Sequence, residues 1–231
     1  PLVNVNVFFE GLTNHFRKTS VRFFLQGSFS NFSSRGFMGT TATSTPITHI
    51  FSKNETSLVS TNPATGEVIG TIPVFSAEKV YKESLKAREA QKDWALLSPK
   101  TRSKFIIRFQ KILIEKADEI ADLIVKENGK TKNEAFIMEI APVIDMASYF
   151  ASLAVKTLKR QTINFHFLAS ALKKGYVYFQ PRGIIGIISP WNFPFSLTAS
   201  ETLCALLAGN AVLIKPSEHT SQIIMKLKEY L

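Results

Sequence analysis

The sequence predicts an α/β protein whose amino-terminal part is helical and whose carboxyl-terminal part begins a parallel sheet. Between about residues 77 and 158, apolar residues recur at three- and four-residue steps, which is the period of amphipathic helices. After these helices, two short apolar runs, Ile184–Ile188 and Ala211–Ile214, flank another helical stretch. Buried parallel strands have this composition, so the two runs and the stretch between them predict a strand–helix–strand unit.

The composition allows a folded core and argues against two classes of partner. With 231 residues, 45% of them hydrophobic, the chain can bury a core of one or two domains. Its apolar runs are far shorter than the roughly 20 residues that a bilayer requires, so no membrane span is expected. The net charge of +10 suggests nucleic acid, but the basic residues alternate with acids at helical spacing, as on a solvated helix face. Because no nucleic-acid-binding motif accompanies the charge, we expect no nucleic-acid partner.

Residues 1–54 differ from the rest and predict a non-globular leader. They contain nine of the nineteen phenylalanines and a single acid, Glu10. An Arg- and Ser-rich, acid-poor segment is typical of a mitochondrial transit peptide. The chain begins at Pro1, however, and Met38 offers a later start, which favours translated sequence upstream of the true start. The single cysteine fits a reducing compartment. We therefore expect a cytoplasmic protein, with the mitochondrial matrix as the alternative if residues 1–37 are a transit peptide.

Residues 55–160 predict a hairpin followed by helices. The turn Asn62–Glu67 separates two short apolar runs. Ser76 is placed to cap a first helix, a second is expected from Thr101 to about Asn128, and a third from about Lys132 to Leu158. Pro142 predicts a kink near the start of the third helix. The inward-facing residues expected in the third helix are Ile140, Ile144, Tyr149 and Leu153.

The remaining chain predicts strands and one strand–helix–strand unit. Residues 161–182 contain the aromatic, β-branched run Tyr176–Phe179, which is typical of an edge or interface strand. Residues 183–231 contain the two apolar strands with a helix, Leu197–Ala208, between them. A further helix begins near Gln222, and the sheet needs another strand after it. We therefore expect the unit to be truncated at Leu231.

Two segments follow the predicted strands and carry the polar residues of a candidate site. Ligands of open parallel sheets bind at the carboxyl ends of the strands, where the sequence places Ser189–Pro194 and Lys215–Glu218. Two prolines stiffen the first segment, so the Asn192 amide could point steadily at a developing oxyanion. Lys215 could contact ribose or phosphate oxygens and Glu218 could accept from ribose hydroxyls, which favours NAD over NADP. An ordinary surface ion pair is the alternative for these two residues. The usual glycine-rich phosphate loop is missing.

At these residues the sequence resembles the aldehyde dehydrogenase superfamily. The run Gly183–Phe195, with its Pro-Trp-Asn-Phe-Pro loop, is similar to one of the family's sequence blocks. Ala205–Val212 and Lys215–Glu218 resemble the next two blocks, with the same order and spacing. The turn Asn62–Glu67 resembles an early turn of the family. The resemblance covers about residues 58–231 and rests on three ordered blocks. Members of this family also lack the ordinary glycine loop.

The resemblance implies a fold and a set of site residues. It implies amino-terminal helices and an incomplete Rossmann-like parallel sheet, with residues 161–182 as part of an oligomerisation arm of a homodimer or homotetramer. Asn192 matches the family's oxyanion-stabilising asparagine, and the residues before it match loop residues on the nicotinamide side of the cofactor. The cofactor is expected to be NAD, with NADP as the other possibility. The residues expected to bind it are Ser189, Pro190, Trp191, Asn192, Lys215, Pro216, Ser217 and Glu218.

The resemblance also implies a reaction whose reactive side chains are not in this sequence. In the family, a cysteine thiolate attacks the aldehyde, hydride passes to NAD(P), and a glutamate activates water that releases the acid. Both residues are expected beyond Leu231, so the 231 residues alone should be inactive. Cys204 lies within a predicted helix among apolar neighbours, which predicts a buried, inert thiol. The histidines lack metal-ligand spacing, so no metal is expected. The alternative is a non-catalytic remnant that acts as a nucleotide-binding or subunit-interaction module.

Overall fold

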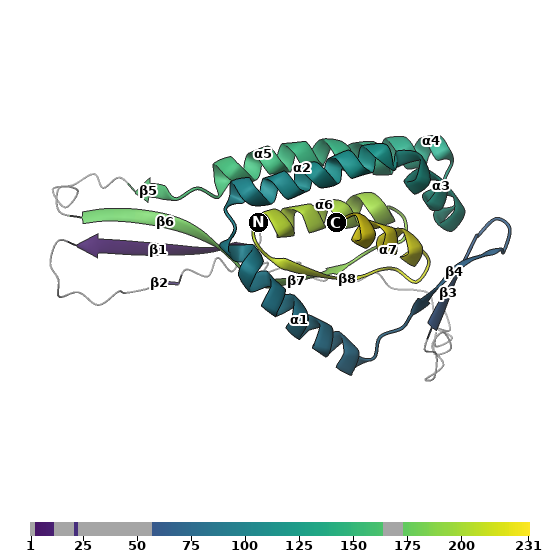
Figure 1. Ribbon diagram of the computed structural model, residues 1–231, viewed down its shortest axis with the longest axis horizontal. Helices are drawn as coiled ribbons and strands as arrows, with labels where there is room; N and C mark the ends of the chain where they lie inside the picture. Colours follow the sequence, from purple (N-terminus) through teal and green to yellow (C-terminus); the bar gives the residue numbers. More distant parts are fainter. Residues whose placement is uncertain (1–2, 12–20, 23–56, 164–172) are drawn as a thin grey trace, which may run out of the picture.

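A computed structural model describes residues 3–11, 21–22, 57–163 and 173–231 of the chain. In it, α6 and α7 lie on one face of the two-stranded sheet β7–β8, with α2 and α5 packed outside them, and α1 lies on the opposite side of the sheet (Figure 1). The elements, in chain order, are β1 (Val3–Gly11), β2 (Val21–Arg22), β3 (Ser57–Thr61), β4 (Val68–Pro73), α1 (Ala77–Leu96), α2 (Pro99–Glu115), α3 (Ala117–Asn128), α4 (Lys132–Glu134), the π-helix η1 (Ala135–Ile140), α5 (Ala141–Thr157), β5 (Gln161–Ile163), β6 (Lys173–Pro181), β7 (Ile184–Ile188), α6 (Pro194–Leu207), β8 (Ala211–Lys215) and α7 (Ser221–Tyr230).

The predicted strand–helix–strand unit is confirmed. β7 and β8 pair in parallel with Ile184 opposite Ala211, and α6 connects them. Asn210 is fully buried at the start of β8. Its Oδ1 accepts hydrogen bonds from the backbone N–H groups of Arg182 and Gly183, at 2.6 and 3.0 Å, and its Nδ2 donates to a carbonyl of α6. One buried amide therefore joins the entry to β7, the end of α6 and the entry to β8.

Side chains from the amino-terminal helices satisfy the last carbonyls of α6. The last turn of a helix leaves its C=O groups without partners inside the helix. Trp94 Nε1 donates to the Leu206 carbonyl at 2.8 Å, and Arg102 Nε donates to the Leu207 carbonyl at 2.9 Å. Arg102 is buried, and this burial lowers the pKa of its guanidinium. These contacts fix the carboxyl end of α6 against α1 and α2.

The helix expected from Thr101 to Asn128 is interrupted. The structure forms α2 and α3, with Lys116 between them at φ −102° and ψ 9°. The apolar period continues across this break, so periodicity alone could not reveal it. The predicted end is confirmed, since Gly129 follows α3 with φ 79°, a conformation that glycine adopts without a steric penalty.

In the third helical segment Pro142 lies in the first turn of α5, the kink expected there stays a prediction, and the buried face differs from the prediction. The π-helix η1 precedes α5, and such turns shift the angular phase of the residues that follow. Tyr149 and Leu153, expected inside, are 60% and 40% exposed. Small residues are buried instead: α5 buries Val143, Ala147, Ala151 and Ala154. The predicted inner face was therefore wrong in its second half, because close packing on α2 selects small side chains and not large ones.

The α5 surface lets α2 approach closely. Ser103 Oγ donates to the Ala151 carbonyl at 2.7 Å, and Gln110 Nε2 donates to the Ile144 carbonyl at 2.7 Å.

The continuous helical stretch Lys132–Thr157 is long and apolar enough to cross a membrane by length and composition alone. Core helices pass the same test, and this one contributes its alanine face to the hydrophobic core, so it is weak evidence for a membrane span.

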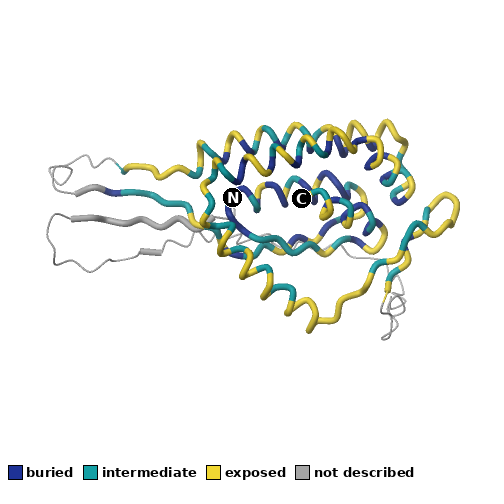
Figure 2. Tube along the Cα trace, in the orientation of Figure 1, coloured by how far each residue is buried: buried dark blue, intermediate teal, exposed yellow. Residues whose placement is uncertain are grey.

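α1 lies mostly in solvent. None of its residues is fully buried, and the apolar Val80 and Leu85 are each nearly half exposed. Lys82 and Glu78 form an ion pair of 2.7 Å at i,i+4 spacing, as expected for a solvated face. Figure 2 shows that dark, buried segments concentrate in the helices above the sheet and not in α1.

The strands β1, β6 and β5 form an arm that extends away from the helical body (Figure 1). β6 is the predicted strand of residues 176–179, extended at both ends, and it lies between β1 and β5 in antiparallel pairing. β1 lies within the segment expected to be a non-globular leader. Val and Asn alternate in Val3–Val7, which is a strand pattern. The rest of residues 1–54, apart from β2, lies outside the described residues.

The alanine face of α5 yields a stability prediction. Replacing Ala147, which is fully buried, by Leu should force α2 and α5 apart and lower the free energy of unfolding by about 1–3 kcal/mol. The matched control is Ala90→Leu on α1, at an exposed position, where the same change should have little effect. Urea denaturation followed by far-UV circular dichroism measures both, and equal stabilities for the two variants would contradict this packing.

Candidate functional site

Two loops lie side by side at the carboxyl ends of β7 and β8, as the sequence predicted. The first contains Ser189 to Phe193 and leads into α6, and the second contains Pro216 to Thr220 and leads into α7. The Ser189 N–H donates to the Lys215 carbonyl at 2.9 Å, which extends the strand pairing into the loops. The candidate residues of both segments therefore occupy one edge of the sheet.

The first loop is held from the side by the turn that follows α3. Asn128 Nδ2 donates to the Trp191 carbonyl at 2.7 Å. Lys130 Nζ donates to the Asn192 carbonyl at 2.5 Å and lies 4.2 Å from the centroid of the Phe193 ring. The positive φ of Gly129 turns the chain between these two residues. The rigidity expected from the two prolines is thus reinforced by contacts from a distant segment.

A buried carboxylate holds the same loop where it becomes α6. Glu139, in η1, is fully buried, and its Oε2 accepts from the N–H groups of Phe195 and Ser196 at 2.9 and 3.0 Å. Its Oε1 forms an ion pair with Lys130. The first N–H groups of a helix have no partners within it, and they favour a negative charge. Glu139 therefore caps α6, whose own N-cap residue, Phe193, makes no side-chain cap.

The Asn192 side chain is exposed and oriented by its own backbone. Its Oδ1 accepts from the Phe193 N–H at 3.0 Å. Among the described residues, no hydrogen bond is made by its Nδ2, so the NH₂ group is the end of the amide that remains available. Asn192 is thus presented as a hydrogen-bond donor, which is what stabilisation of an oxyanion requires.

The three residues before Asn192 differ in accessibility. Ser189 is buried and its hydroxyl bonds that of Thr198, so it holds the loop against α6 and does not offer a free group. Pro190 is half-buried, and Trp191 is 59% exposed. Of the residues expected on the nicotinamide side, Trp191 is therefore the one that presents a large surface to a ligand.

The second loop presents two charged side chains. Lys215 and Glu218 are both exposed and form an ion pair of 3.8 Å, and Lys215 Nζ also donates to the Pro216 carbonyl. The pKa of Glu218 is lowered, first by a hydrogen bond from its own backbone N–H and then by the nearby charges of Lys215 and His219. Glu218 therefore stays a carboxylate at neutral pH. This pair of a cation and an acceptor fits the hydroxyls of a ribose.

The other two predicted residues of this segment shape the loop. Pro216 is half-buried. Ser217 is buried, and its Oγ accepts from the His219 N–H at 3.3 Å. Its carbonyl accepts from the Thr220 N–H at 3.3 Å. Ser217 therefore stabilises the turn into α7.

A second buried glutamate caps α7. Glu127 accepts from the N–H groups of Gln222 and Ile223 at 2.7 and 2.9 Å. It also accepts from Ser60 Oγ at 2.7 Å, which ties the β3–β4 hairpin to the same point. α7 makes no side-chain cap at its own N-cap residue, Thr220. Both helices that follow the sheet strands thus begin on a buried carboxylate from the amino-terminal part.

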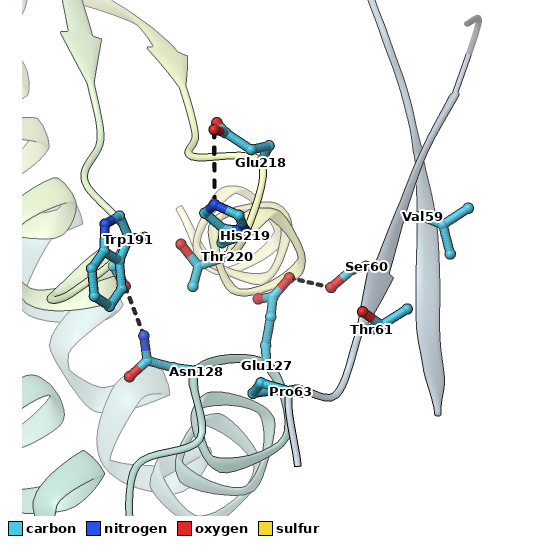
Figure 3. Close-up of a pocket in the computed structure, with 10 residues that line it drawn as sticks. All are labelled: Val59, Ser60, Thr61, Pro63, Glu127, Asn128, Trp191, Glu218, His219 and Thr220. Carbon is cyan, nitrogen blue, oxygen red and sulfur yellow. Dashed lines mark hydrogen bonds and ion pairs between the residues drawn. The ribbon is translucent and has the colours of Figure 1, made fainter. Parts of the chain in front are cut away.

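A pocket of about 370 Å³ lies between the hairpin, the end of α3 and the two loops (Figure 3). Trp191 lines it from the first loop and Glu218 from the second, and Glu127 and Asn128 line it from the end of α3. It thereby joins one residue from each predicted segment. Its lining residues are Val59, Ser60, Thr61, Pro63, Glu127, Asn128, Trp191, Glu218, His219 and Thr220.

Cys204 is exposed and lies on α6, away from both loops in the sequence. The prediction of a buried thiol was therefore wrong, because the face of α6 that carries Cys204 is not covered by the described part of the chain. Desolvation by its neighbours raises the pKa of the thiol, and the Glu201 carboxylate adds to the increase. A raised pKa keeps the sulfur protonated near neutral pH, which is unfavourable for a nucleophile.

Sequence reasoning missed the residues that hold the site. Lys130, Glu139 and Glu127 were treated as parts of helices and turns. One signal was available, since Glu139 is the single charged residue of the apolar run Ala135–Val143. A lone acid in such a run is buried with its helix and must find partners. The backbone N–H groups that it accepts from, however, lie more than 50 positions further along the chain.

Comparisons with known proteins agree with the geometry. The sequence model of the aldehyde dehydrogenase family matches residues 50–231. A Mycobacterium ulcerans protein provisionally named as an NADP(+)-dependent succinate-semialdehyde dehydrogenase is 38% identical over 167 residues, which are 72% of this chain and 32% of that protein. The chain therefore spans about a third of the length of this relative.

Solved structures give the same result. An NADP-dependent glyceraldehyde-3-phosphate dehydrogenase of Bacillus halodurans, solved with NADP, superposes with a TM-score of 0.70 and 30% identity over 75% of this chain and 37% of that one. An NAD-dependent benzaldehyde dehydrogenase of Corynebacterium glutamicum superposes with a TM-score of 0.67 and 29% identity over 75% and 37%. With the family match covering most of its residues and the loops placed at the strand ends, the chain belongs to the aldehyde dehydrogenase family.

Proposed function

We propose that this chain is the amino-terminal part of an NAD(P)-dependent aldehyde dehydrogenase, which oxidises an aldehyde to a carboxylic acid through a cysteine thiohemiacetal. The nucleophilic cysteine and the glutamate base belong, in this proposal, to sequence beyond Leu231. The observation that carries the proposal is the presentation of Asn192. Its amide lies at the carboxyl end of β7, with Oδ1 held by the Phe193 N–H and Nδ2 available as a donor.

The proposed role of Asn192 is to stabilise the oxyanion that develops on the aldehyde oxygen. A donor contributes most when it is oriented before the charge appears, because no reorganisation is then needed during the reaction. Asn192 meets this condition from two sides, since its side-chain oxygen bonds Phe193 and its carbonyl bonds Lys130. We expect Trp191 to contact the nicotinamide side of the cofactor.

Lys215 and Glu218 would hold the adenosine ribose of the cofactor, with Pro216 and Ser217 shaping the loop between them. NAD(P), when bound, accepts hydride from the substrate. The Glu218 carboxylate would accept from ribose hydroxyls and repel a 2′-phosphate, so we favour NAD. The neighbouring structures include both an NAD-dependent and an NADP-dependent enzyme, which keeps NADP in the proposal.

Substrate, assembly and location are further parts of the proposal. The name of the mycobacterial relative makes succinate semialdehyde a first aldehyde to test. The β6 arm would pair subunits in a homodimer or homotetramer of the whole protein. A cytoplasmic location, or the mitochondrial matrix, would suit a protein with a single cysteine in its 231 residues.

The first prediction about activity is that the isolated 231 residues do not oxidise aldehydes. Cys204, the one cysteine of the sequence, is the only thiol available, and its raised pKa disfavours the thiolate. NADH and NADPH formation, followed at 340 nm with succinate semialdehyde, should stay at the rate without protein. Turnover that disappears in Cys204→Ser would overturn the proposal that the nucleophile lies further along the chain.

Titration with NAD, together with size-exclusion chromatography, distinguishes a part of a catalytic enzyme from the alternative, a non-catalytic binding or interaction module. A nucleotide-binding or subunit-interaction module would be monodisperse and would bind NAD or a partner subunit. A fragment with catalytic function only in the whole protein would bind NAD weakly and self-associate through surfaces that the rest of the protein covers.

The second prediction concerns Asn192 in a whole enzyme that carries this segment. Asn192→Ala should lower kcat by roughly 10²–10³-fold, the usual loss for one oxyanion donor, and should leave the Kd for NAD almost unchanged. Steady-state kinetics and NAD titration measure the two effects. Asn133→Ala, at an exposed position in α4, is the matched control. Equal losses in kcat and in NAD affinity would argue against an oxyanion role.

A further inference from the structure

We propose that Lys130 and Glu139 are positioning residues that set the orientation of Asn192. This inference rests on the oxyanion role proposed above, and it assigns to an ion pair in the amino-terminal helices the task of holding the donor in place. Neither residue belongs to the three sequence blocks from which the site was predicted. Both lie within the stretch between α3 and α5.

Lys130 contacts the first loop at Asn192, the proposed oxyanion donor. Its Nζ donates to the Asn192 carbonyl at 2.5 Å, forms the ion pair with Glu139, and lies 4.2 Å from the centroid of the Phe193 ring. One ammonium group therefore contacts both the backbone of Asn192, through a hydrogen bond, and the ring of Phe193, through a cation–π contact. Its side chain is only 15% exposed, so solvent screens these contacts little.

Glu139 connects that ammonium to the start of α6. One carboxylate oxygen pairs with Lys130, and the other accepts from the N–H groups of Phe195 and Ser196. The pair therefore forms hydrogen bonds on both sides of Pro194. Lys130 bonds Asn192 before it, and Glu139 bonds the first turn of α6 after it. Rotation of the Asn192 peptide would break the bond to Lys130. A shift of the helix would break the bonds to Glu139.

A role in stability alone does not account for this arrangement. A buried ion pair often contributes little net stability compared with apolar residues of the same size, because both charges must be desolvated. α6 could also be capped more simply by a Ser, Thr or Asp at its own N-cap position, which Phe193 occupies. Glu139 caps α6 from a distance, and so it couples the helix start to Lys130 and to the loop. Such coupling is useful when the orientation of one amide must be fixed.

The kinetic test uses Lys130→Met, Lys130→Arg and Asn192→Ala in the whole enzyme. A misplacement of about 1 Å can cost roughly 10²-fold in rate, so Lys130→Met should lower kcat by about 10- to 100-fold. The KM for NAD should change less than threefold. Lys130→Arg keeps a cation and donors at this position and should recover most of the loss. An unchanged kcat in Lys130→Met, or no recovery in Lys130→Arg, would overturn the proposal.

A double-mutant cycle shows whether Lys130 acts through Asn192. If it does, Lys130→Met combined with Asn192→Ala should be no slower than Asn192→Ala alone, because the positioned donor is already gone. Losses that multiply would mean that Lys130 acts by another route, which would refute the inference. An Asn192→Ala enzyme with normal kcat would refute the oxyanion role instead.

Arg102→Lys provides the matched control for general destabilisation. Arg102 is a buried cation that holds the opposite end of α6, through the Leu207 carbonyl. Its replacement should lower the midpoint of thermal unfolding as Lys130→Met does, but it should leave kcat within about twofold of the parent at a temperature where both are folded. Equal losses of kcat in the two variants would show a merely structural role.

A measurement that does not depend on enzymatic activity tests whether Lys130 and Glu139 hold the loop in the 231-residue chain. Hydrogen–deuterium exchange should show faster exchange at residues 192–196 in Lys130→Met and in Glu139→Gln, while the α2–α5 pair keeps its protection. Arg102→Lys should instead loosen residues 206–210. Unchanged exchange at residues 192–196 in both loop variants would contradict the positioning role, whatever the outcome for the oxyanion proposal.

Discussion

The amino-terminal N–H groups of α6 and α7 must find acceptors, and two buried carboxylates supply them. Glu139 takes the first N–H groups of α6, and Glu127 takes those of α7. A buried carboxylate without partners would be very costly, but here every oxygen is bonded: the remaining acceptor capacity goes to Lys130 and to Ser60. The same hydrogen bonds therefore supply acceptors to the helix N–H groups and donors to the buried carboxylates.

This arrangement explains why the helices that precede the sheet belong to the site. In the unit β7–α6–β8–α7 the candidate loops lie directly before α6 and α7, so the position of a helix start fixes the end of its loop. The acids that set those positions come from α3 and η1, and Glu127 lies 95 residues before the first α7 residue that bonds its Oε1, Gln222. The π-helix η1 carries Glu139 on the same buried side as Ala135 and Ile140, which belong to the hydrophobic core.

The sequence was sufficient where local pattern decides the structure and insufficient where partners are distant. β7, β8, the Ser76 cap and the Gly129 turn follow from apolar runs, capping residues and glycine, and all are observed. The inner face of α5 was mispredicted because size was used to judge burial, whereas close helix packing favours alanine. Cys204 was expected inside because its sequence neighbours are apolar, although its own face of α6 is uncovered in the described structure. The two capping glutamates needed knowledge of segments that only folding brings together. The roles of Asn192, Lys215 and Glu218 stay predictions.

The two halves of the candidate site differ in how firmly they are held, and the difference suits their proposed tasks. The Asn192 loop is fixed by the buried ion pair of Lys130 and Glu139, by the hydrogen bonds through which Glu139 caps α6, and by the Asn128 amide. Lys215 and Glu218 are exposed and held by an ion pair of 3.8 Å, which contributes little in solvent. A donor that stabilises a transition state must be in place before the charge develops, because any reorganisation would add to the barrier. Residues that contact a ribose can adjust as the cofactor binds, since their contacts need only be complete in the bound state. The rigid contacts are therefore concentrated at the loop whose geometry would limit the rate in the proposed reaction, and the amino-terminal helices supply them.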